Sequence, residues 1–389
     1  MKILCLDVET QISNKGNPFD TTNKCVCIGL KWIGGEYDCY IKYDSFEKLQ
    51  FSIDKADMLV GFNIKFDLHW LRRVGLTFEN KRIWDCQIGE FILNNQKTPY
   101  PSLNDAALKY GFNLKLDVIK KEYWDKGIDT DAIPREILSE YLEQDLLLTE
   151  QVFTKQRELF KEDGRFKIFK LQCLDLVVLQ EMEYNGIVFN IEKALEKAQT
   201  IEKELNEISS KINGFVGGVP ININSNDHLS ALLYGGSILE DIRIPVGIFK
   251  TGAKQGQIRH KILTKEYKLP RLIEPIKGTE TEKSKKKSLE SGCEASLWEV
   301  NETTLRKLKL NKEAKLLVSY INKYSELEKL RGTYLIGYCE LIKKMNWKHN
   351  VLHGTLNQCV AITGRLSSTR PNLQNADPTT KTFMESWYL

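Results

Sequence analysis

Residues 3–10 read Ile3-Leu4-Cys5-Leu6-Asp7-Val8-Glu9-Thr10, an apolar run that closes on two acidic side chains. A short, continuous apolar run of this kind predicts a buried β-strand at 3–8. Asp7 and Glu9 lie two residues apart, so their side chains leave the same face of the strand. Two carboxylates at this spacing can reach one Mg²⁺, although a lone Asp-x-Glu pair is more often part of an ordinary exposed face.

The chain around this strand alternates between strand and helix patterns as far as residue 160. Two further strands are predicted at 26–32 and 58–62. Apolar Phe66, Trp70 and Leu71 follow the second of these at helical spacing, and a long helical pattern covers 137–160. This alternation predicts an α/β domain at 1–160. The rest of the chain is mainly helical, with predicted helices at 171–184, 191–212 and 303–344, and with a Gly-, Pro- and Lys-rich insertion at about 245–297.

Three more polar residues lie at positions that often carry functional groups in α/β domains. Asp67 follows the third predicted strand where a helix begins, which is a usual position for site residues in α/β folds. Tyr141 and Asp145 lie four residues apart on the predicted helix 137–160 and therefore share one face. Taken singly, Asp67 is explained as a negative charge that stabilises the start of a helix. Tyr141 and Asp145, taken alone, are explained as solvent-exposed side chains on one helix face.

Taken together, the acidic residues fall into three short motifs. They are Asp7-Val8-Glu9, Asn63-Ile64-Lys65-Phe66-Asp67 and, on one helix face, Tyr141 with Asp145. Their order and spacing resemble the three motifs of the DEDDy group of 3′ to 5′ exonucleases, whose domain is ribonuclease H-like.

The resemblance to these exonucleases implies specific roles. Four carboxylates would hold two divalent metal ions, and Tyr141 would orient the attacking water. Two metal ions about 4 Å apart supply a nucleophile at neutral pH and stabilise the leaving oxygen of a phosphodiester. Oxygen ligands accept either Mg²⁺ or Mn²⁺. Lys65 and His69 lie close by in sequence, but we assign them no catalytic role. The implied metal ligands are Asp7, Glu9, Asp67 and Asp145.

A second string stands near the end of the chain and reads Thr363-Gly364-Arg365-Leu366-Ser367-Ser368-Thr369-Arg370-Pro371-Asn372-Leu373-Gln374-Asn375. It is similar, almost letter for letter, to a segment of the family A DNA polymerases, and 223–229 and 330–335 also resemble the thumb of that family. The resemblance implies minor-groove and sugar contacts with primer-template DNA by Arg365, Asn372 and Gln374, and a phosphate contact by Arg370. Minor-groove acceptors are alike in all base pairs, so such contacts hold a duplex without reading its sequence.

This resemblance predicts the domain order of the whole chain. An exonuclease domain occupies 1–160, a thumb-like helical region with the basic insertion occupies 161–345, and the start of a polymerase palm occupies 346–389. The palm motif A, the fingers helix and the second palm Asp find no match in these 389 residues. We therefore expect a fold that combines a ribonuclease H-like α/β domain, a helical thumb and an incomplete palm truncated before motif A.

The preferred interpretation is the exonuclease-bearing amino-terminal subunit or fragment of a bacteriophage-type polymerase. It would proofread DNA and grip the primer-template. A separate carboxyl-terminal polypeptide would supply polymerisation, and a processivity factor is a further candidate partner. Two alternatives stay open: a free-standing 3′ to 5′ DNA exonuclease, and a non-catalytic DNA-binding subunit. A ribonuclease of the same exonuclease group would explain residues 1–160, but the polymerase-like string favours DNA.

The charge distribution and the composition indicate possible binding partners and the cellular compartment of the protein. The net charge of +4 hides a local excess, because residues 250–287 hold 12 basic against 4 acidic residues. This composition predicts an exposed, mobile loop around Lys283–Lys287 that either contacts phosphates or is merely solvated. Nine cysteines without a disulfide or zinc pattern indicate reduced thiols. With neither a signal peptide nor an apolar membrane span, we expect a cytoplasmic protein, in the host cytoplasm if a phage encodes it.

Overall fold

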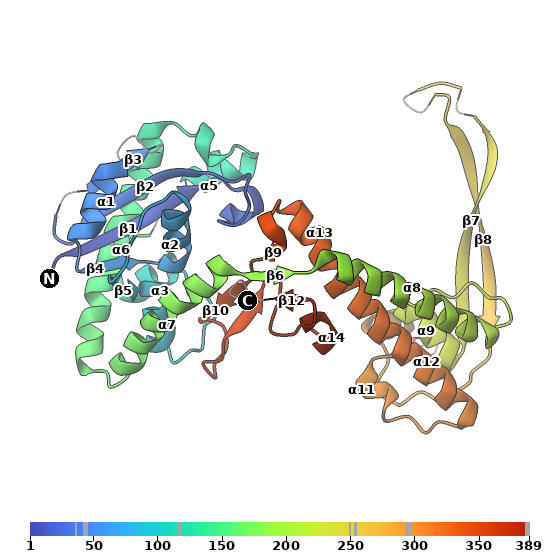
Figure 1. Cartoon of the computed structure of the whole chain (residues 1–389). Coiled ribbons are helices and arrows are strands. Elements are labelled where there is room, and N and C mark those ends of the chain that lie inside the picture. The colour runs from blue at the N-terminus through green and yellow to red at the C-terminus, as the bar shows by residue number, and fades with distance from the viewer. Residues whose placement is uncertain are drawn as a thin grey trace. The chain divides into compact units, whose positions relative to one another are not determined.

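The computed structural model describes residues 1–35, 37–41, 46–114, 118–248, 250–252, 255–291 and 297–385. The chain forms two compact units, of which unit 1 is Met1–Ile191 with Tyr338–Leu389 and unit 2 is Glu192–Gly337 (Figure 1). These bounds differ from the predicted domain limits at 160 and 345. The helix that follows residue 160 packs on the first sheet, where Phe169 lies 4.5 Å from Trp84 between ring centroids, and so belongs to unit 1.

A five-stranded mixed sheet with the order β3-β2-β1-β4-β5 forms the centre of unit 1. Strand β1 pairs antiparallel with β2 and parallel with β4, which places Asp7 opposite Gly29 and Glu9 opposite Cys27. The strands predicted at 3–8, 26–32 and 58–62 are confirmed within two residues. The bounds are β1 Ile3–Thr10, β2 Cys25–Trp32, β3 Tyr37–Ile41, β4 Met58–Gly61 and β5 Arg82–Asp85.

In the described part of unit 1, seven α-helices precede residue 186. The long helix α6 crosses the sheet and contacts β1 to β4, and its buried face includes Leu142, Leu146 and Phe153. Fully buried side chains of the sheet, among them Leu4 and Leu59, complete this core. The bounds are α1 Phe46–Lys55, α2 Ile64–Arg73, α3 Cys86–Leu93, α4 Leu103–Tyr110, α5 Val118–Glu122, α6 Arg135–Glu162 and α7 Phe166–Asn185.

The carboxyl-terminal segment returns to unit 1 and pairs with the chain that follows α7. Gly186 ends α7 at φ 63°, as the Asn-Gly break predicts, and a Cβ there would lie 2.6 Å from the Leu352 carbonyl oxygen. The three-stranded sheet has the order β12-β6-β9, and β10 pairs with β11. The bounds are β6 Ile187–Phe189, α13 Gly337–Lys344, β9 Val351–Leu352, β10 Thr355–Asn357, β11 Ser367–Thr369, α14 Pro378–Lys381 and β12 Met384–Glu385.

Unit 2 combines helices with one long β-hairpin that extends away from α9 (Figure 1). Helix α8 contacts α12 through Lys211, which lies over the ring of Tyr320, and Phe215, directly after α8, packs edge-on against the same ring at 6.4 Å between centroids. The bounds are α8 Ile191–Gly214, α9 Asn226–Tyr234, β7 Gly236–Ile248, β8 Ile258–Leu269, α10 Glu282–Ser291, α11 Glu302–Leu305, α12 Lys312–Lys329 and the π-helix η4 Leu330–Ile336.

The prediction of a mobile loop around Lys283–Lys287 is wrong. These residues belong to helix α10, where the Lys283 ammonium lies 2.6 Å from an Asp227 carboxylate oxygen and Lys285 pairs with Glu282. Lys and Glu are good helix formers, and the segment holds no Gly or Pro to stop the helix. The first part of the insertion forms one continuous hairpin, in which β-branched Ile residues recur on both strands and lie opposite partners such as Tyr267, Leu263 and Ile258.

Two further sequence predictions concern the cysteines and membranes. The seven cysteines whose side chains the structure describes are free thiols, and six of them are buried, as predicted: Cys5, Cys25, Cys27, Cys86, Cys173 and Cys359 are buried, and Cys339 is half-buried. Within the same described ranges, no helix combines the length and the apolar character needed to cross a membrane.

Candidate active site

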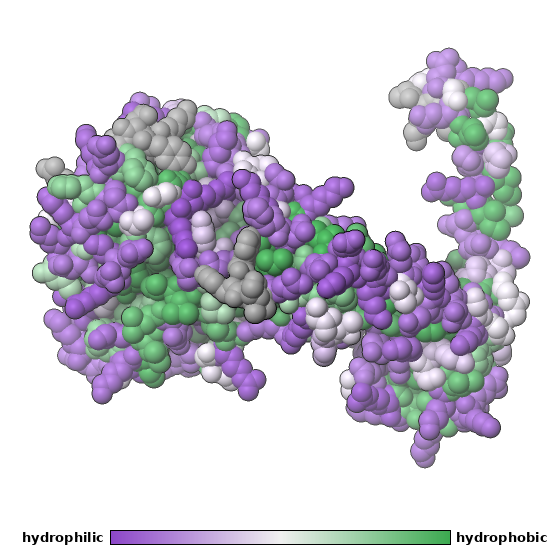
Figure 2. Space-filling model, viewed as in Figure 1, coloured by the Kyte–Doolittle hydropathy of each residue, from purple (hydrophilic) through white to green (hydrophobic). Residues whose placement is uncertain are grey.

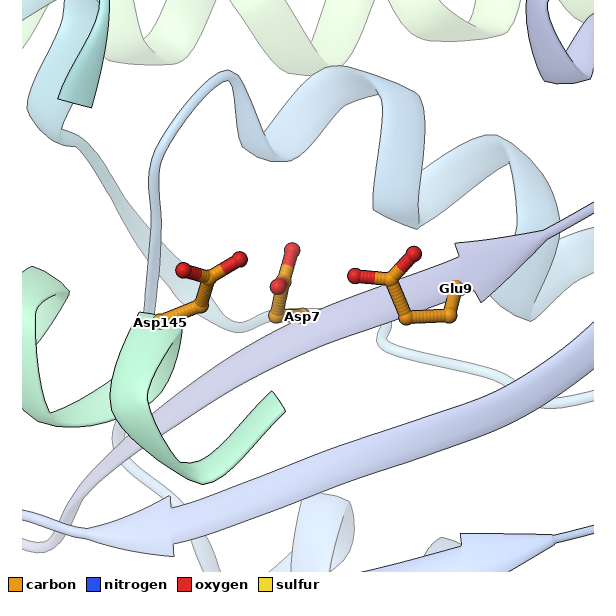
Figure 3. Close-up of side chains that lie close together, drawn as sticks. All are labelled: Asp7, Glu9 and Asp145. Atoms are coloured by element: carbon orange, nitrogen blue, oxygen red, sulfur yellow. The ribbon is translucent and has the colours of Figure 1, made fainter. Parts of the chain in front are cut away.

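Strand β1 and helix α6 bring three carboxylates together. One oxygen from each of Asp7, Glu9 and Asp145 lies within 4.8 Å of the others, and Asp7 stands between the other two (Figure 3). Asp7 is half-buried, whereas the Glu9 residue is 9% and the Asp145 residue 3% exposed. Two positions on one strand and one on a helix 136 residues later thus form a single acidic cluster, as the exonuclease-like motifs predict.

Gly29 allows α6 to approach the sheet closely enough for this cluster to form. It lies opposite Asp7 on β2, and a Cβ at this position would be 2.7 Å from Cγ of Leu142 and 2.8 Å from a methyl carbon of Leu146. These two leucines flank Asp145 on α6. Sequence reasoning missed Gly29, because a glycine inside an apolar strand gives no sign of which helix covers it.

Asp67 lies beside the cluster rather than within it. Its Oδ1 accepts a hydrogen bond of 3.0 Å from the Val8 backbone N–H, between the two acidic residues of β1. Asp67 is 2% exposed, and burial, together with the negative charge of Asp7, raises the pKa of its carboxyl well above the usual range. A cation bound close to Asp67 would stabilise the ionised form of its carboxyl group and would lower its pKa again.

The donor set of this cluster fits hard divalent cations. Its donors are carboxylate oxygens only, with no His or Cys, and such oxygens suit Mg²⁺ and Mn²⁺ better than Zn²⁺. Three anionic groups within 4.8 Å also repel one another, and a dication relieves that repulsion. We therefore treat Asp7, Glu9 and Asp145 as candidate metal ligands, with Asp67 adjacent.

Tyr141 lies one helical turn before Asp145 on the buried face of α6. Its ring packs edge-on against Trp124 at 6.2 Å, and the residue is 6% exposed. The shared helix face predicted for Tyr141 and Asp145 is therefore present. The edge-on contact with Trp124 restricts the tyrosine ring.

Asp85 is a second structural residue that the sequence analysis missed. Its two carboxylate oxygens accept backbone hydrogen bonds of 2.9 Å, one from Ile64 at the start of α2 and one from Ile88 in the first turn of α3. Burial raises the pKa of Asp85 to about 6. One carboxylate thus ties the helix that carries Asp67 to the next helix along the chain.

Glu183 organises a buried polar network on the other side of α2. It accepts hydrogen bonds from Lys65 Nζ at 2.5 Å and from the Leu356 backbone N–H at 2.6 Å, and its Oε2 lies 2.7 Å from His69 Nε2. Burial lowers the pKa of His69, although the bond to Glu183 opposes that shift. Lys65 and His69 on α2 are thus both held by Glu183. Local sequence cannot reveal this network, because Glu183 lies more than 100 residues from Lys65, His69 and Leu356.

The polymerase-like string 363–375 forms β11 and the turn after it. Ser368 is 3% exposed, and its Oγ accepts a hydrogen bond of 3.1 Å from the Leu373 backbone N–H, which fixes the turn. The four side chains predicted to contact DNA are all exposed: Arg365, Arg370, Asn372 and Gln374.

A cavity of about 220 Å³ lies between α2 and the carboxyl-terminal strands of unit 1. Lys15, Asn63, Tyr100 and Arg370 line it, together with Asn357 of β10. The lining is rich in amide and basic groups, which are the donors that phosphate and sugar oxygens accept from. Asn63 and Phe66, the helix-start neighbours of Asp67, form one wall of the cavity.

Comparison with known proteins places these features in a family context. Residues 272–385 match the model of DNA polymerase family A. DNA polymerase I of Bacillus subtilis is 24% identical over 293 residues, which are 75% of this chain and 27% of that protein. DNA polymerase I of Borreliella burgdorferi is 27% identical over 321 residues, or 82% of this chain and 28% of that protein. The chain thus spans little more than a quarter of the length of these relatives.

A solved structure with the same fold is the POL domain of Pol1 from M. smegmatis, determined with a DNA primer-template and a dNTP. The TM-score is 0.63 at 15% identity, and the match covers 98% of this chain and 53% of that one. The chain is therefore a relative of the family A DNA polymerases, and its mixed α/β fold is similar to that of a DNA polymerase domain.

Proposed function

We propose that this chain is the exonuclease-bearing amino-terminal part of a family A DNA polymerase. It hydrolyses DNA from the 3′ end at the acidic cluster, and it grips primer-template DNA through 363–375. In this proposal residues 1–160 are a ribonuclease H-like exonuclease domain, 161–345 a thumb, and 346–389 the start of a palm. The observation that carries the proposal is the convergence of Asp7, Glu9 and Asp145 within 4.8 Å in a relative of DNA polymerases.

Each acidic residue has a defined task in this proposal. Asp7, Glu9 and Asp145 hold divalent cations, and Asp67 adds its charge from beside β1. Two bound cations would supply a nucleophilic water at neutral pH and charge compensation at the leaving 3′ oxygen. Tyr141, fixed by Trp124, orients the attacking water. The product is a 5′-mononucleotide.

The chain also offers a route for the DNA. The cavity lined by Asn63, Tyr100 and Arg370 adjoins the helix that carries Asp67, and its amide and basic groups suit a single-stranded 3′ end. Arg365, Asn372 and Gln374 are exposed on the same unit and suit the sugar edges of a duplex.

Polymerisation requires groups that have no counterpart among residues 1–389. The palm motif A and the fingers helix bind the incoming triphosphate with its metal ion in the family that this chain resembles. We propose that a carboxyl-terminal polypeptide, separate from this chain or joined to it, supplies them. A processivity factor is a further candidate partner.

Digestion of single-stranded DNA tests the exonuclease proposal. The purified chain is incubated with a 5′-labelled oligonucleotide, with and without Mg²⁺, beside an Asp7→Ala/Glu9→Ala variant. A matched control replaces two exposed carboxylates of α1 and the following turn, Asp54→Ala/Asp57→Ala. We expect a Mg²⁺-dependent ladder from the unmodified chain and the control, and a loss on the order of 100-fold or more in the site variant.

Two results would count against the proposal. Equal digestion by the site variant and the control would place the nuclease elsewhere or in a contaminant. No digestion by any of the three proteins, with unfolding midpoints alike, would favour a DNA-binding subunit without catalysis.

A further inference from the structure

Two adjoining hollows lie in unit 1, and the residues that line them include none of the acidic cluster. The β5 hollow has a volume of about 590 Å³ and lies between strand β5 and helices α6 and α7, with Trp84 and Phe169 in its wall. The α1 hollow has a volume of about 680 Å³ and lies between helix α1 and the ends of β1 and β2, with Phe51 in its wall. Met1 and Arg157 line both hollows, so a ligand that enters one also reaches the other.

The wall of the β5 hollow is rich in apolar side chains. Trp84 and Phe169 form its buried part, and their ring centroids lie 4.5 Å apart. Phe166 and Leu174 also line it and are 38% and 66% exposed. Figure 2 shows hydrophobic side chains gathered over this part of unit 1. Apolar side chains of a partner that entered the hollow would remove this surface from water, which favours binding.

The charged side chains that line the two hollows are all basic. No Asp or Glu is found among the described residues of either wall. Cations concentrated on one surface produce a positive potential, which attracts anionic groups. Arg157 contributes to both hollows, because it stands between them. The basic residues of the two walls are Lys2, Lys55, Lys81, Arg82, Arg157 and Lys170.

Two of these cations lie against aromatic rings. The Arg157 guanidinium is 5.4 Å from the centroid of the Phe153 ring, and the Lys55 ammonium is 3.9 Å from the centroid of the Phe51 ring. An aromatic ring attracts a cation but does not neutralise its charge. Both cations therefore keep a charge with which a carboxylate can pair.

We infer that the two hollows form a docking surface for an acidic peptide of a partner protein. Aromatic or aliphatic side chains of the peptide enter the hollows, and its carboxylates pair with the basic residues of the walls. A second copy of this chain fits less well, because it would bring like charges together around a two-fold axis. This inference does not depend on the proposed function, since the hollows share no residue with the acidic cluster.

Single-stranded nucleic acid is also anionic, but the aromatic side chains of this surface suit it less well. Its bases bind by stacking on exposed aromatic faces. Lys55 already covers one face of the Phe51 ring, and Phe166 is stacked on Phe169 with the centroids 6.2 Å apart. Trp84 is only 5% exposed. The apolar hollows therefore favour side chains that insert over bases that stack.

A binding measurement with matched charge variants tests the inference. The probe is a fluorescein-labelled peptide in which Asp alternates with Phe and Leu, and its binding to the full chain is followed by fluorescence anisotropy. Arg157→Gln/Lys170→Gln removes two cations of the β5 hollow. Lys161→Gln/Lys167→Gln removes the same charge from exposed positions of α6 and α7 that line neither hollow. We expect the control to bind like the unmodified chain, and the hollow variant to bind at least about 10-fold more weakly.

A second pair of variants tests the apolar contacts independently. Leu174 lines the β5 hollow, whereas Leu171, one turn earlier on α7 and 55% exposed, lines neither hollow. We expect Leu174→Ser to weaken peptide binding by about 5-fold or more and Leu171→Ser to leave it unchanged. A peptide with Ser in place of Phe and Leu should lose most of its affinity for the unmodified chain. Urea unfolding midpoints show whether each variant keeps the stability of the unmodified chain.

Four results would overturn the inference. The first two are no peptide binding by the unmodified chain and equal binding by the hollow variant and its control. The third is an equal loss of oligodeoxythymidylate binding and of peptide binding in Arg157→Gln/Lys170→Gln, which would assign the surface to nucleic acid. The fourth is self-association of the chain that Leu174→Ser abolishes, which would assign the surface to a second copy.

Discussion

Gly29 lies opposite Asp7 on β2, where it lets the part of α6 around Asp145 pack closely on the sheet. A Cβ at Gly29 would overlap Leu142 and Leu146 at 2.7 and 2.8 Å, so α6 would have to move away from β1. We predict that Gly29→Ala lowers the free energy of unfolding by about 1–3 kcal/mol and reduces nuclease activity more than this destabilisation explains. Urea unfolding and the rate of digestion measure the two effects.

Gly164 is the matched control for this substitution. It lies between α6 and α7, and a Cβ there would meet nothing within 4 Å. Gly164→Ala should leave both quantities close to those of the unmodified chain. Unchanged activity in a folded Gly29→Ala protein would contradict the claim that close packing of α6 sets the cluster.

Asp85 provides a prediction of pH dependence. Burial raises its pKa to about 6 from an ordinary value of 3.8, so the folded state binds the proton more tightly than the unfolded state. Its contribution to stability is complete below about pH 4 and is lost as the pH rises through 6. We predict that the unmodified chain loses roughly 3 kcal/mol relative to Asp85→Asn over this interval.

Urea unfolding of both proteins at several pH values between 4 and 7 measures this difference. Asp85→Asn keeps the shape of the side chain and one acceptor for the helix-start N–H groups, but it does not titrate. A constant difference between the two proteins over the whole interval would show that Asp85 does not change its protonation there.

At the scale of elements, the β7–β8 hairpin is the most unusual part of unit 2. Register pairs place Lys261 opposite Ile244 and Lys265 opposite Glu240, so both lysines lie on one face. We predict that this face contacts DNA phosphates and that Lys261→Gln/Lys265→Gln makes the slope of log affinity against log salt concentration shallower by about 1–2. Titration of primer-template DNA at several salt concentrations measures the slope.

Two exposed lysines of α1 serve as the control for the hairpin. Lys48→Gln/Lys55→Gln removes the same charge from a helix far in sequence from the hairpin. The control should change the slope by much less. An equal change in both variants would mean that the hairpin contributes only to the overall charge.

The sequence predicts elements well where the pattern is local. The strands at 3–8 and 26–32 and the helix at 137–160 agree with β1, β2 and α6, because continuous apolar runs and helical spacing are properties of neighbouring residues. The loop predicted at Lys283–Lys287 failed because lysine-rich composition indicates exposure but does not distinguish loop from helix. The hairpin was not predicted, because a Gly-, Pro- and Lys-rich composition indicates an irregular insertion, whereas β7 continues through a bulge between Pro245 and Gly247.

In the candidate site, too, the sequence predicts the local motifs but not the contacts between distant segments. The motifs predict which carboxylates gather, and the cluster of Asp7, Glu9 and Asp145 agrees with them. They do not predict that Asp67 bonds to the Val8 backbone, nor that Glu183 joins α2 to β10. Those contacts depend on segments that only tertiary packing brings together.

At the scale of the molecule, the acidic cluster and the string 363–375 belong to the same compact unit. Lys65 and His69 on α2 and Leu356 on β10 share Glu183, so one buried network joins the helix that carries Asp67 to the strand paired with β11. A buried charge network of this kind is strongly destabilised when one member is lost. Unit 1 therefore presents the proposed nuclease site and the proposed DNA contacts as one folded body.

The most direct test of the central claim is the length of a 5′-labelled primer, annealed to its template, after incubation with the chain, Mg²⁺ and all four deoxynucleotides. The account predicts that the unmodified chain only shortens the primer, that Asp7→Ala/Glu9→Ala leaves it intact, and that extension appears only when the palm-and-fingers polypeptide is added. Extension by this chain alone, or an intact primer with the unmodified chain, would contradict it.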